Sequence, residues 1–236
     1  MKIHAPPPSK RAFVYATLRA DILACVRRPG QRLVIDDLAS ELGVSPIPVR
    51  EALQQLSYEG LVHFEPYVGA RVSEIHVELI EEVFALLAAL EVLSSRAACV
   101  RMTDDDFAAM RTMLQRMDAL VDDPEAWSQA NVELHQFLAA CAAMVLVPAM
   151  MSRALEHWQR FRRYFLEEVF ARRITRAQQE HWQLLAALQT RDADHVESVI
   201  RTHNRTALAG YMDFLTRNNP FQTTSSALAG STTETS

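Results

Sequence analysis

Helix-breaking residues are distributed unevenly along this chain, and that distribution constrains its fold more than any other feature. Four of the six glycines lie before residue 75, whereas between residues 80 and 217 the only breakers are Pro124, Pro148 and Gly210. Leu, Ala, Arg and Glu, which favour helices, dominate this second segment. We therefore expect a mainly α protein, with a turn-rich N-terminal domain at residues 10–75 and an all-α helical bundle at residues 79–217.

The ends of the chain and its cysteines limit its class and location. Residues 218–236 are rich in Ser and Thr and carry one charged residue, Glu234, which predicts a disordered tail. The chain has no run of eighteen uncharged apolar residues, and its N-terminus lacks the apolar stretch of a signal peptide. We expect a cytoplasmic protein with no membrane partner. Three widely spaced cysteines favour neither a disulfide framework nor a zinc finger.

Charge divides along the same boundary as the glycines. The formal net charge of −5 comes from +1 over residues 1–75 and −6 over the rest of the chain. An acidic balance argues against non-specific coating of nucleic acid, although a small domain can still bind DNA through a few placed arginines. Net charge alone therefore does not decide the function.

The N-terminal domain has the pattern of a helix-turn-helix. The stretch FVYATLRADILACV at residues 13–26 places apolar residues every four positions, which predicts a short amphipathic helix. The stretch DDLASEL predicts a second helix, with Asp36 as its N-cap and Gly43 at its end. A short helix, a glycine-bearing turn and a further helix are typical of a helix-turn-helix.

The stretch GVSPIPVREALQQLSYEGLV predicts the helix that follows this turn. Ser45 can cap its N-terminus, and proline is tolerated in a first turn because the first N–H groups have no intrahelical acceptor. The helix can begin at Pro46, or at Pro48 because a residue before proline avoids the helical region. After its end at Gly60, the stretch LVHFEPYVGARVSEI predicts two short strands around a turn, which form a wing beside the helix.

Residues 13–74 resemble the winged helix-turn-helix of the GntR family of bacterial transcriptional regulators. The resemblance is carried by PGQRL, DDLASELGVSPIPVREALQQLSYEGLV and PYVGARV. It implies that Arg32, Ser45 and Arg50 approach phosphates or base edges of double-stranded DNA, and that the wing near Gly69 enters the minor groove. Arginine offers a fork for phosphate or guanine, and glycine permits close backbone approach. The DNA-binding candidates are Arg32, Ser45, Pro46, Arg50, Gly69 and Arg71.

Two positions depart from the pattern of that family. The family commonly carries arginine where this chain has Pro46, and often where it has Val68. Two DNA contacts of the family are therefore missing. We expect either an operator that differs from the family consensus or an affinity that depends more on Arg32, Arg50 and Arg71.

Residues 80–216 resemble the ligand-binding domain of the FadR-type branch of the GntR family, known as the FCD domain. The resemblance is carried by EEVFALLAALEVLSSRAACV, NVELHQFLAA and EHWQLLAALQTRDADHVESVIRTHN. It implies that Asn131, His135, His181 and His203 converge on a divalent metal inside the bundle. Three imidazoles and one oxygen ligand suit Zn, Ni, Mn or Fe, with positions left for water or an acidic ligand. The family usually has Asp where this chain has Asn131, so the neutral amide should lower metal affinity. The alternative for each histidine is a core or surface role without metal.

The ligand of the helical domain is predicted less directly. Many members of the family carry, where this chain has Leu87, an arginine that clamps a carboxylate of the ligand. Arg162, Arg163 or Arg173 can supply a positive charge for the effector instead, or lie on a solvated face. No carboxylate is evident as a base beside the histidines, and Glu180 is expected to point to a different helical face from His181.

The resemblance implies a homodimeric DNA-binding regulator whose operator binding responds to a small organic acid. We expect a repressor that leaves its operator when a carboxylic acid binds. A small rotation of the two winged domains of a dimer would remove their contacts with both half-sites at once. One alternative is a metal sensor in which the ion itself is the effector. A metal-dependent hydrolase is disfavoured because H-E-x-x-H, G-x-S-x-G and P-loop motifs do not occur.

Overall fold

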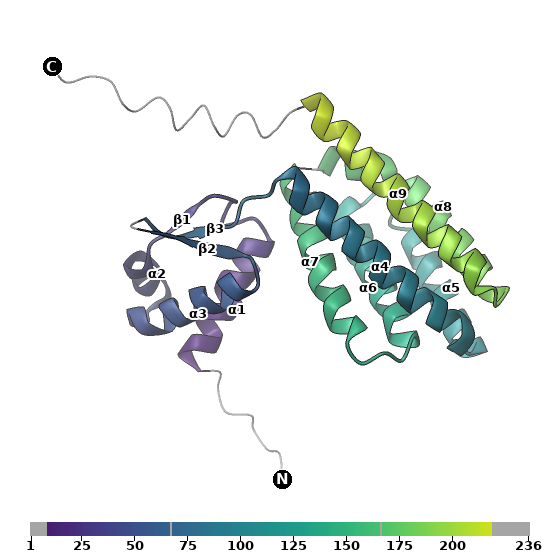
Figure 1. Ribbon diagram of the computed structural model, residues 1–236, viewed down its shortest axis with the longest axis horizontal. Coiled ribbons are helices and arrows are strands. Elements are labelled where there is room, and N and C mark those ends of the chain that lie inside the picture. The colour runs from purple at the N-terminus through teal and green to yellow at the C-terminus, as the bar shows by residue number, and fades with distance from the viewer. Residues whose placement is uncertain (1–8, 67, 166, 219–236) are drawn as a thin grey trace, which may run out of the picture. The chain divides into compact units, whose positions relative to one another are not determined.

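The computed structural model describes residues 9–66, 68–165 and 167–218. The contacts within the chain divide it between Ile75 and His76 into two compact units, each with its own core. Figure 1 shows a small unit that combines helices with a sheet and a larger unit made of long helices. The predicted fold class, a winged helix-turn-helix and an all-α bundle, is confirmed.

The first unit contains three helices and a three-stranded antiparallel sheet. Its helices are α1 (Lys10–Leu23), α2 (Ile35–Leu42) and α3 (Pro46–Tyr58). Its strands are β1 (Arg32–Leu33), β2 (Val62–Glu65) and β3 (Gly69–Val72), in the order β1-β3-β2. The predicted wing is therefore present as the β2–β3 pair, in which Glu65 lies opposite Gly69 and Val62 opposite Val72.

The core of this unit follows from the four-residue spacing of its first helix. The apolar side chains that repeat along α1 are fully buried and pack against the buried face of α3. They are Val14, Leu18 and Ile22 on α1 and Val49, Leu53 and Leu56 on α3. Because both helices bury one face only, the opposite face of α3 stays in solvent.

The beginnings of α2 and α3 refine two predictions. Asp36 is not the N-cap of α2, because the helix begins at Ile35 and its N-cap is Val34, which places Asp36 in the first turn. There its carboxylate complements the positive end of the helix dipole. α3 begins at Pro46 after Ser45, so the alternative start at Pro48 is wrong. Pro48 fits within the first turn because its missing N–H has no intrahelical acceptor there.

The second unit contains six helices in its described part. They are α4 (Val77–Arg101), α5 (Asp104–Asp118), α6 (Pro124–Cys141), α7 (Val147–Phe165), α8 (Glu167–Gln189) and α9 (Ala193–Asn218). α4 packs against α6, α7 and α9, and α8 packs against α5 and α9. Among the described residues, α4 is also the one helix long and apolar enough to span a membrane, but about half of that stretch is buried in the bundle. A core helix passes the same test.

The three breakers in this segment have different roles. Pro124 is the first residue of α6, where Asp123 caps the helix by accepting a hydrogen bond from the N–H of Ala126. Pro148 lies in the first turn of α7, and Gly210 lies within α9. Proline in a first turn starts a helix rather than ending it, and one glycine is tolerated within a long helix. The predicted tail, apart from Asn218 at the end of α9, lies outside the described residues.

Candidate functional site

Three of the six predicted DNA-binding residues line one hollow on the surface of the first unit. Arg32 of β1, Arg50 of α3 and Gly69 of β3 line it together. Both arginine side chains are exposed, and neither forms an ion pair within the described part of the chain. A guanidinium without an internal carboxylate is available to bind phosphate or a guanine edge.

The start of α3 and the tip of the wing are also open to solvent. Ser45 and Pro46 are exposed, and the Ser45 hydroxyl does not cap its own helix. Gly69 has φ +106°, a conformation that favours glycine, and a Cβ there would meet no other atom within 4 Å. Glycine therefore keeps the tip of the wing open to close approach.

Arg71 differs from the other two arginines because its side chain is already bound. Its Nε donates to Glu65 Oε2 at 3.0 Å, and its Nη1 donates to the carbonyl oxygen of Gly30 at 3.0 Å. These contacts tie β3 to β2 and to the turn before β1. In this structure Arg71 braces the wing.

Gln54 and Phe64 also line the hollow, although neither was selected from the sequence. Gln54 is exposed one turn after Arg50 on the same face of α3, and Phe64 of β2 lies beside the wing. The four-residue spacing from Arg50 was a signal for Gln54. The position of Phe64 at the hollow, by contrast, depends on how the strands pair and could not be predicted from spacing.

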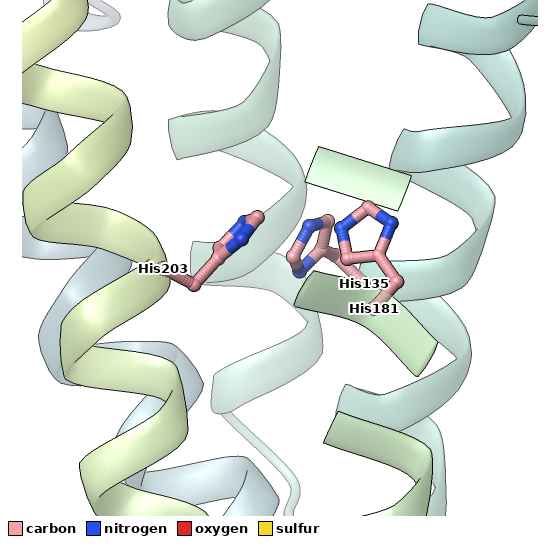
Figure 2. A group of neighbouring side chains, drawn as sticks. All are labelled: His135, His181 and His203. Atoms are coloured by element: carbon pink, nitrogen blue, oxygen red, sulfur yellow. The ribbon is translucent and has the colours of Figure 1, made fainter. Parts of the chain in front are cut away.

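The three predicted histidines of the second unit converge inside the bundle. His135 of α6, His181 of α8 and His203 of α9 each offer a ring nitrogen, and these nitrogens lie within 4.8 Å of one another. Figure 2 shows the three side chains pointing toward one another from separate helices. His135 and His181 are almost fully buried, at 3% and 1% exposure.

His181 has the buried environment typical of a metal ligand. Both of its ring nitrogens are buried, and neither has a hydrogen-bond partner in the described part of the chain. Burial, and then the nearby His203 and His135, hold the pKa of His181 well below its usual value. A neutral imidazole with an unused lone pair can bind a cation without first losing a proton. The donor set of this site fits a divalent ion.

A buried carboxylate contacts His135. Glu91 of α4 places Oε1 2.9 Å from His135 Nδ1, and its other oxygen accepts a hydrogen bond of 2.6 Å from the amide of Asn204. Burial opposes the charge on each partner, but their mutual attraction prevails and lowers the pKa of Glu91 while raising that of His135. A carboxylate at Nδ1 leaves Nε2 of His135 as the free nitrogen.

A second carboxylate contacts His203. Glu180 Oε2 lies 2.8 Å from His203 Nδ1 and accepts a hydrogen bond of 2.8 Å from Arg173. The expectation that no carboxylate lies beside the histidines is therefore wrong, because Glu180 contacts His203 from the neighbouring position to His181 on α8. Although Glu180 and His181 are consecutive on α8, the packing of α8 against α9 brings His203 within reach of the Glu180 side chain.

The remaining predicted residues divide between a pocket beside the histidines and the layer behind it. Asn131 lies one turn before His135 and lines this pocket, as do Leu87 and Arg173. Arg162 pairs with Glu125, and its guanidinium lies 5.1 Å from the ring centre of Phe170, which lines the pocket. Arg173 is thus the predicted arginine placed in the pocket wall, and Arg162 lies behind it.

The rest of the pocket wall is mostly aromatic. Phe84 and Tyr211 pack with ring centres 5.4 Å apart, and burial raises the pKa of Tyr211 to about 12. The other aromatic residues of the wall are Trp127, Trp158 and Phe170. The sequence analysis missed Glu91, although it is the one charged residue between Glu82 and Arg96 in an apolar helix.

Comparisons with known proteins agree with both units. A family profile for the FCD domain matches residues 82–206, and one described as "Bacterial regulatory proteins, gntR family" matches residues 10–72. An uncharacterised HTH-type regulator from an unstable DNA locus of Streptomyces ambofaciens is 29% identical over 197 residues, which is 84% of this chain and 83% of that protein. The HTH-type transcriptional repressor RspR of Escherichia coli is 25% identical, over 80% of this chain and 83% of its own.

Among solved structures, this fold is similar to that of E. coli McbR/YncC. The two align with a TM-score of 0.69 and 20% identity, over 88% of this chain and 99% of the other. At that identity the likeness shows the fold alone.

Proposed function

This chain belongs to the GntR family of bacterial regulatory proteins and carries an FCD domain, and from that premise we propose how it regulates transcription. It is a transcriptional regulator rather than an enzyme, as are its relatives. We propose a cytoplasmic homodimeric repressor that binds a double-stranded operator through its winged helix-turn-helix. A carboxylic acid held at a divalent metal in the FCD domain would release it.

Two unpaired arginines beside an open wing support the DNA-binding part of this proposal. Arg32 and Arg50 border the hollow beside Gly69, while Ser45 and Pro46 lie exposed at the start of α3. We assign Arg71 a bracing role, because its guanidinium is bound to Glu65 and Gly30. The sign of regulation is supported by the name of the relative RspR, a repressor.

The two unpartnered ring nitrogens of His181 are the observation that carries the effector part. Buried polar atoms are almost always hydrogen-bonded, and leaving them without a partner costs free energy. A cation between His135, His181 and His203 would use the lone pairs, with Asn131 as an oxygen donor on the same face of α6. When bound, the metal would supply positive charge for an anionic ligand. Arg173 is the cation of this wall that the acid would contact.

Metal content is the first test of this site. We expect untagged protein purified without chelator to contain about one metal ion per chain, and a His135→Ala variant to lose it. His195→Ala is the matched control, because His195 is exposed on α9 and is not a member of the histidine cluster. Metal-free wild type that still binds its operator would overturn the metal part and leave the DNA-binding part intact.

The metal sensor is the alternative favoured by the same three histidines, because they can hold an ion without an organic ligand. The two functions differ in what changes operator affinity. We expect metal alone to leave affinity for the DNA upstream of the gene nearly unchanged, and metal with a chelating acid to lower it. A change with metal alone would favour the sensor.

A further inference from the structure

The pocket beside the histidine cluster is lined by an aromatic side chain from each of five helices. All five side chains are buried. Small-molecule sites are mostly apolar and aromatic, with a few polar groups that orient the ligand. The wall of this pocket therefore favours a ligand with an apolar body. We call its five aromatic residues the aromatic wall: Phe84 of α4, Trp127 of α6, Trp158 of α7, Phe170 of α8 and Tyr211 of α9.

The rings of the aromatic wall are tilted against one another. Phe170 lies 5.7 Å from Trp127 and 5.6 Å from Trp158 between ring centres, at interplanar angles of 58° and 69°. Phe84 and Tyr211 are tilted by 50°. Such arrangements are the ones that aromatic rings prefer, so a ligand ring can extend them. A flexible aliphatic ligand would gain burial alone and would lose rotational freedom.

The charges of the pocket limit how many carboxylates a ligand can carry. Apart from the histidines, Glu91 and Arg173 are the charged side chains among the described residues that line it. Arg173 already pairs with Glu180 at 2.8 Å, and Leu87 adds no charge. A second carboxylate on the ligand would be buried near Glu91 without a cation of its own, which costs free energy. The pocket therefore suits one carboxylate.

Two buried donors in the wall have no acceptor. Trp127 Nε1 and Arg173 Nε are both buried, and neither has a hydrogen-bond partner among the residues that the structure describes. Buried donors are almost always paired, and an indole N–H can only donate. Because both residues line the pocket, oxygen atoms of a ligand can accept from them. One carboxylate accounts for Arg173, and a further oxygen on the ligand accounts for Trp127.

We propose that the pocket binds a hydroxybenzoate, an aromatic acid with one ring, one carboxylate and one hydroxyl group. Its ring lies against the aromatic wall, its carboxylate lies toward Arg173 and the histidine cluster, and its hydroxyl oxygen accepts from Trp127. The empty volume of the pocket, about 470 Å³ with its mouth, is near the lower end for small-molecule sites and suits one ring. The inference rests on the proposed function for the site and on the aromatic wall for the chemical class.

Calorimetric titration of a series of acids into the full-length, Zn²⁺-loaded protein tests the class. The series contains benzoate, its three monohydroxy isomers including salicylate, cyclohexanecarboxylate, succinate and malate. We expect the best hydroxybenzoate to bind at least fivefold more tightly than cyclohexanecarboxylate, which has the same charge and a ring of similar size. We expect it to bind at least tenfold more tightly than either dicarboxylate. Aliphatic acids that bind as tightly would overturn the proposal.

Trp127→Phe tests the role of the hydroxyl group, because it keeps a ring and removes the N–H. We expect it to weaken binding of the best hydroxybenzoate about tenfold and binding of benzoate less than twofold. Trp182→Phe is the matched control: Trp182 of α8 donates to Asp118 at 3.1 Å and does not line the pocket. It should change neither affinity. Equal weakening of both acids by Trp127→Phe would overturn the hydroxyl contact. The acid series needs no variant, so it decides the class even if Trp127→Phe is unfolded.

The same titrations separate this inference from the proposed function. Malate or succinate that binds tightly and lowers operator affinity, while the hydroxybenzoates do not bind, would overturn the inference and leave the proposed function standing. A hydroxybenzoate that binds with the expected selectivity and leaves operator affinity unchanged would support the inference and count against the proposed function. Failure of every acid to bind the metal-loaded protein would overturn both.

Discussion

Glu91 is the residue that joins the core of α4 to the histidine cluster. Its carboxylate lies against His135 and Asn204, both buried. Carboxylates in this position orient a metal-binding imidazole, and their removal commonly lowers metal affinity about 10–100-fold. We expect Glu91→Gln to lower affinity for Zn²⁺ by that factor, measured by competition with a chelating dye.

Glu82→Gln is the matched control for that measurement, because Glu82 is an exposed glutamate on the same helix. The d–d spectrum of Co²⁺-loaded protein gives a second readout, since a reoriented His135 changes ligand geometry whereas a general loss of packing does not. Folded Glu91→Gln protein with wild-type affinity and spectrum would show that His135 is oriented without this carboxylate.

The arginines of the first unit separate into two roles that mutation can distinguish. Arg50 is exposed and unpaired, so Arg50→Ala should weaken operator binding by about 10–100-fold, the range for a lost base or phosphate contact, without lowering thermal stability. Arg71→Ala should lower stability as well, because the Glu65 and Gly30 contacts are lost. Fluorescence anisotropy with the upstream DNA and a melting curve measure both effects.

Arg11→Ala is the control for charge alone, since Arg11 is exposed on α1 of the same unit. An Arg50→Ala variant that binds as Arg11→Ala does would remove Arg50 from the DNA interface.

At the scale of elements, backbone conformation decides which glycines matter. Gly43 ends α2 with φ +65°, and a Cβ there would meet nothing within 4 Å, so the cost of Gly43→Ala is conformational alone. We expect it to lower the free energy of unfolding by about 1 kcal/mol. Gly210→Ala is the opposite case, because Gly210 is helical and also has open space. Gly210→Ala should raise the free energy of unfolding by about 0.5–1 kcal/mol. Urea denaturation measures both variants, and equal effects of Gly43→Ala and Gly210→Ala would contradict this reasoning.

Local chemistry explains why the helices could be predicted from the sequence. Pro46 and Pro124 each begin a helix after a polar residue, and the four-residue spacing on α1 matches its buried face. The start of α2 could not be predicted as well, because Asp36 is a good cap by type, whereas Val34, the N-cap in the structure, makes no side-chain capping hydrogen bond.

Some residues of the candidate site meet only through packing between helices, which the spacing of residues along the sequence does not predict. Asn131 and His135 share a face because four residues separate them on one helix. Glu91 and Asn204, by contrast, are far apart in the sequence and meet because α4 packs on α9. The contact of Glu180 with a histidine was missed for the same reason, because it depends on the neighbouring helix that carries His203.

At the scale of the whole molecule, the two faces of α4 lie in different environments. Its buried face carries Glu91 to the pocket, and its opposite face, which includes Leu93, is exposed. A ligand that shifts Glu91 would therefore act on a helix that also reaches the surface of the second unit. Such a shift changes the placement of the winged domains of the proposed dimer only if the ligand binds the DNA-binding state and the non-binding state with different affinities.

Coupling between the pocket and the operator must be reciprocal, which gives a prediction that needs no knowledge of the path between them. An acid that lowers operator affinity by some factor must bind the operator-bound protein more weakly by the same factor, typically 5–150-fold. Salicylate, citrate, malate and lactate are suitable probes because each can chelate a metal. We expect calorimetric titration of the active acid into metal-loaded protein to give a higher dissociation constant when saturating upstream DNA is present. Arg50→Ala protein is the control, and at a DNA concentration that saturates wild type but not this variant it should show a smaller difference. Equal affinity with and without bound operator in wild type would mean that the acid occupies the pocket without regulating transcription.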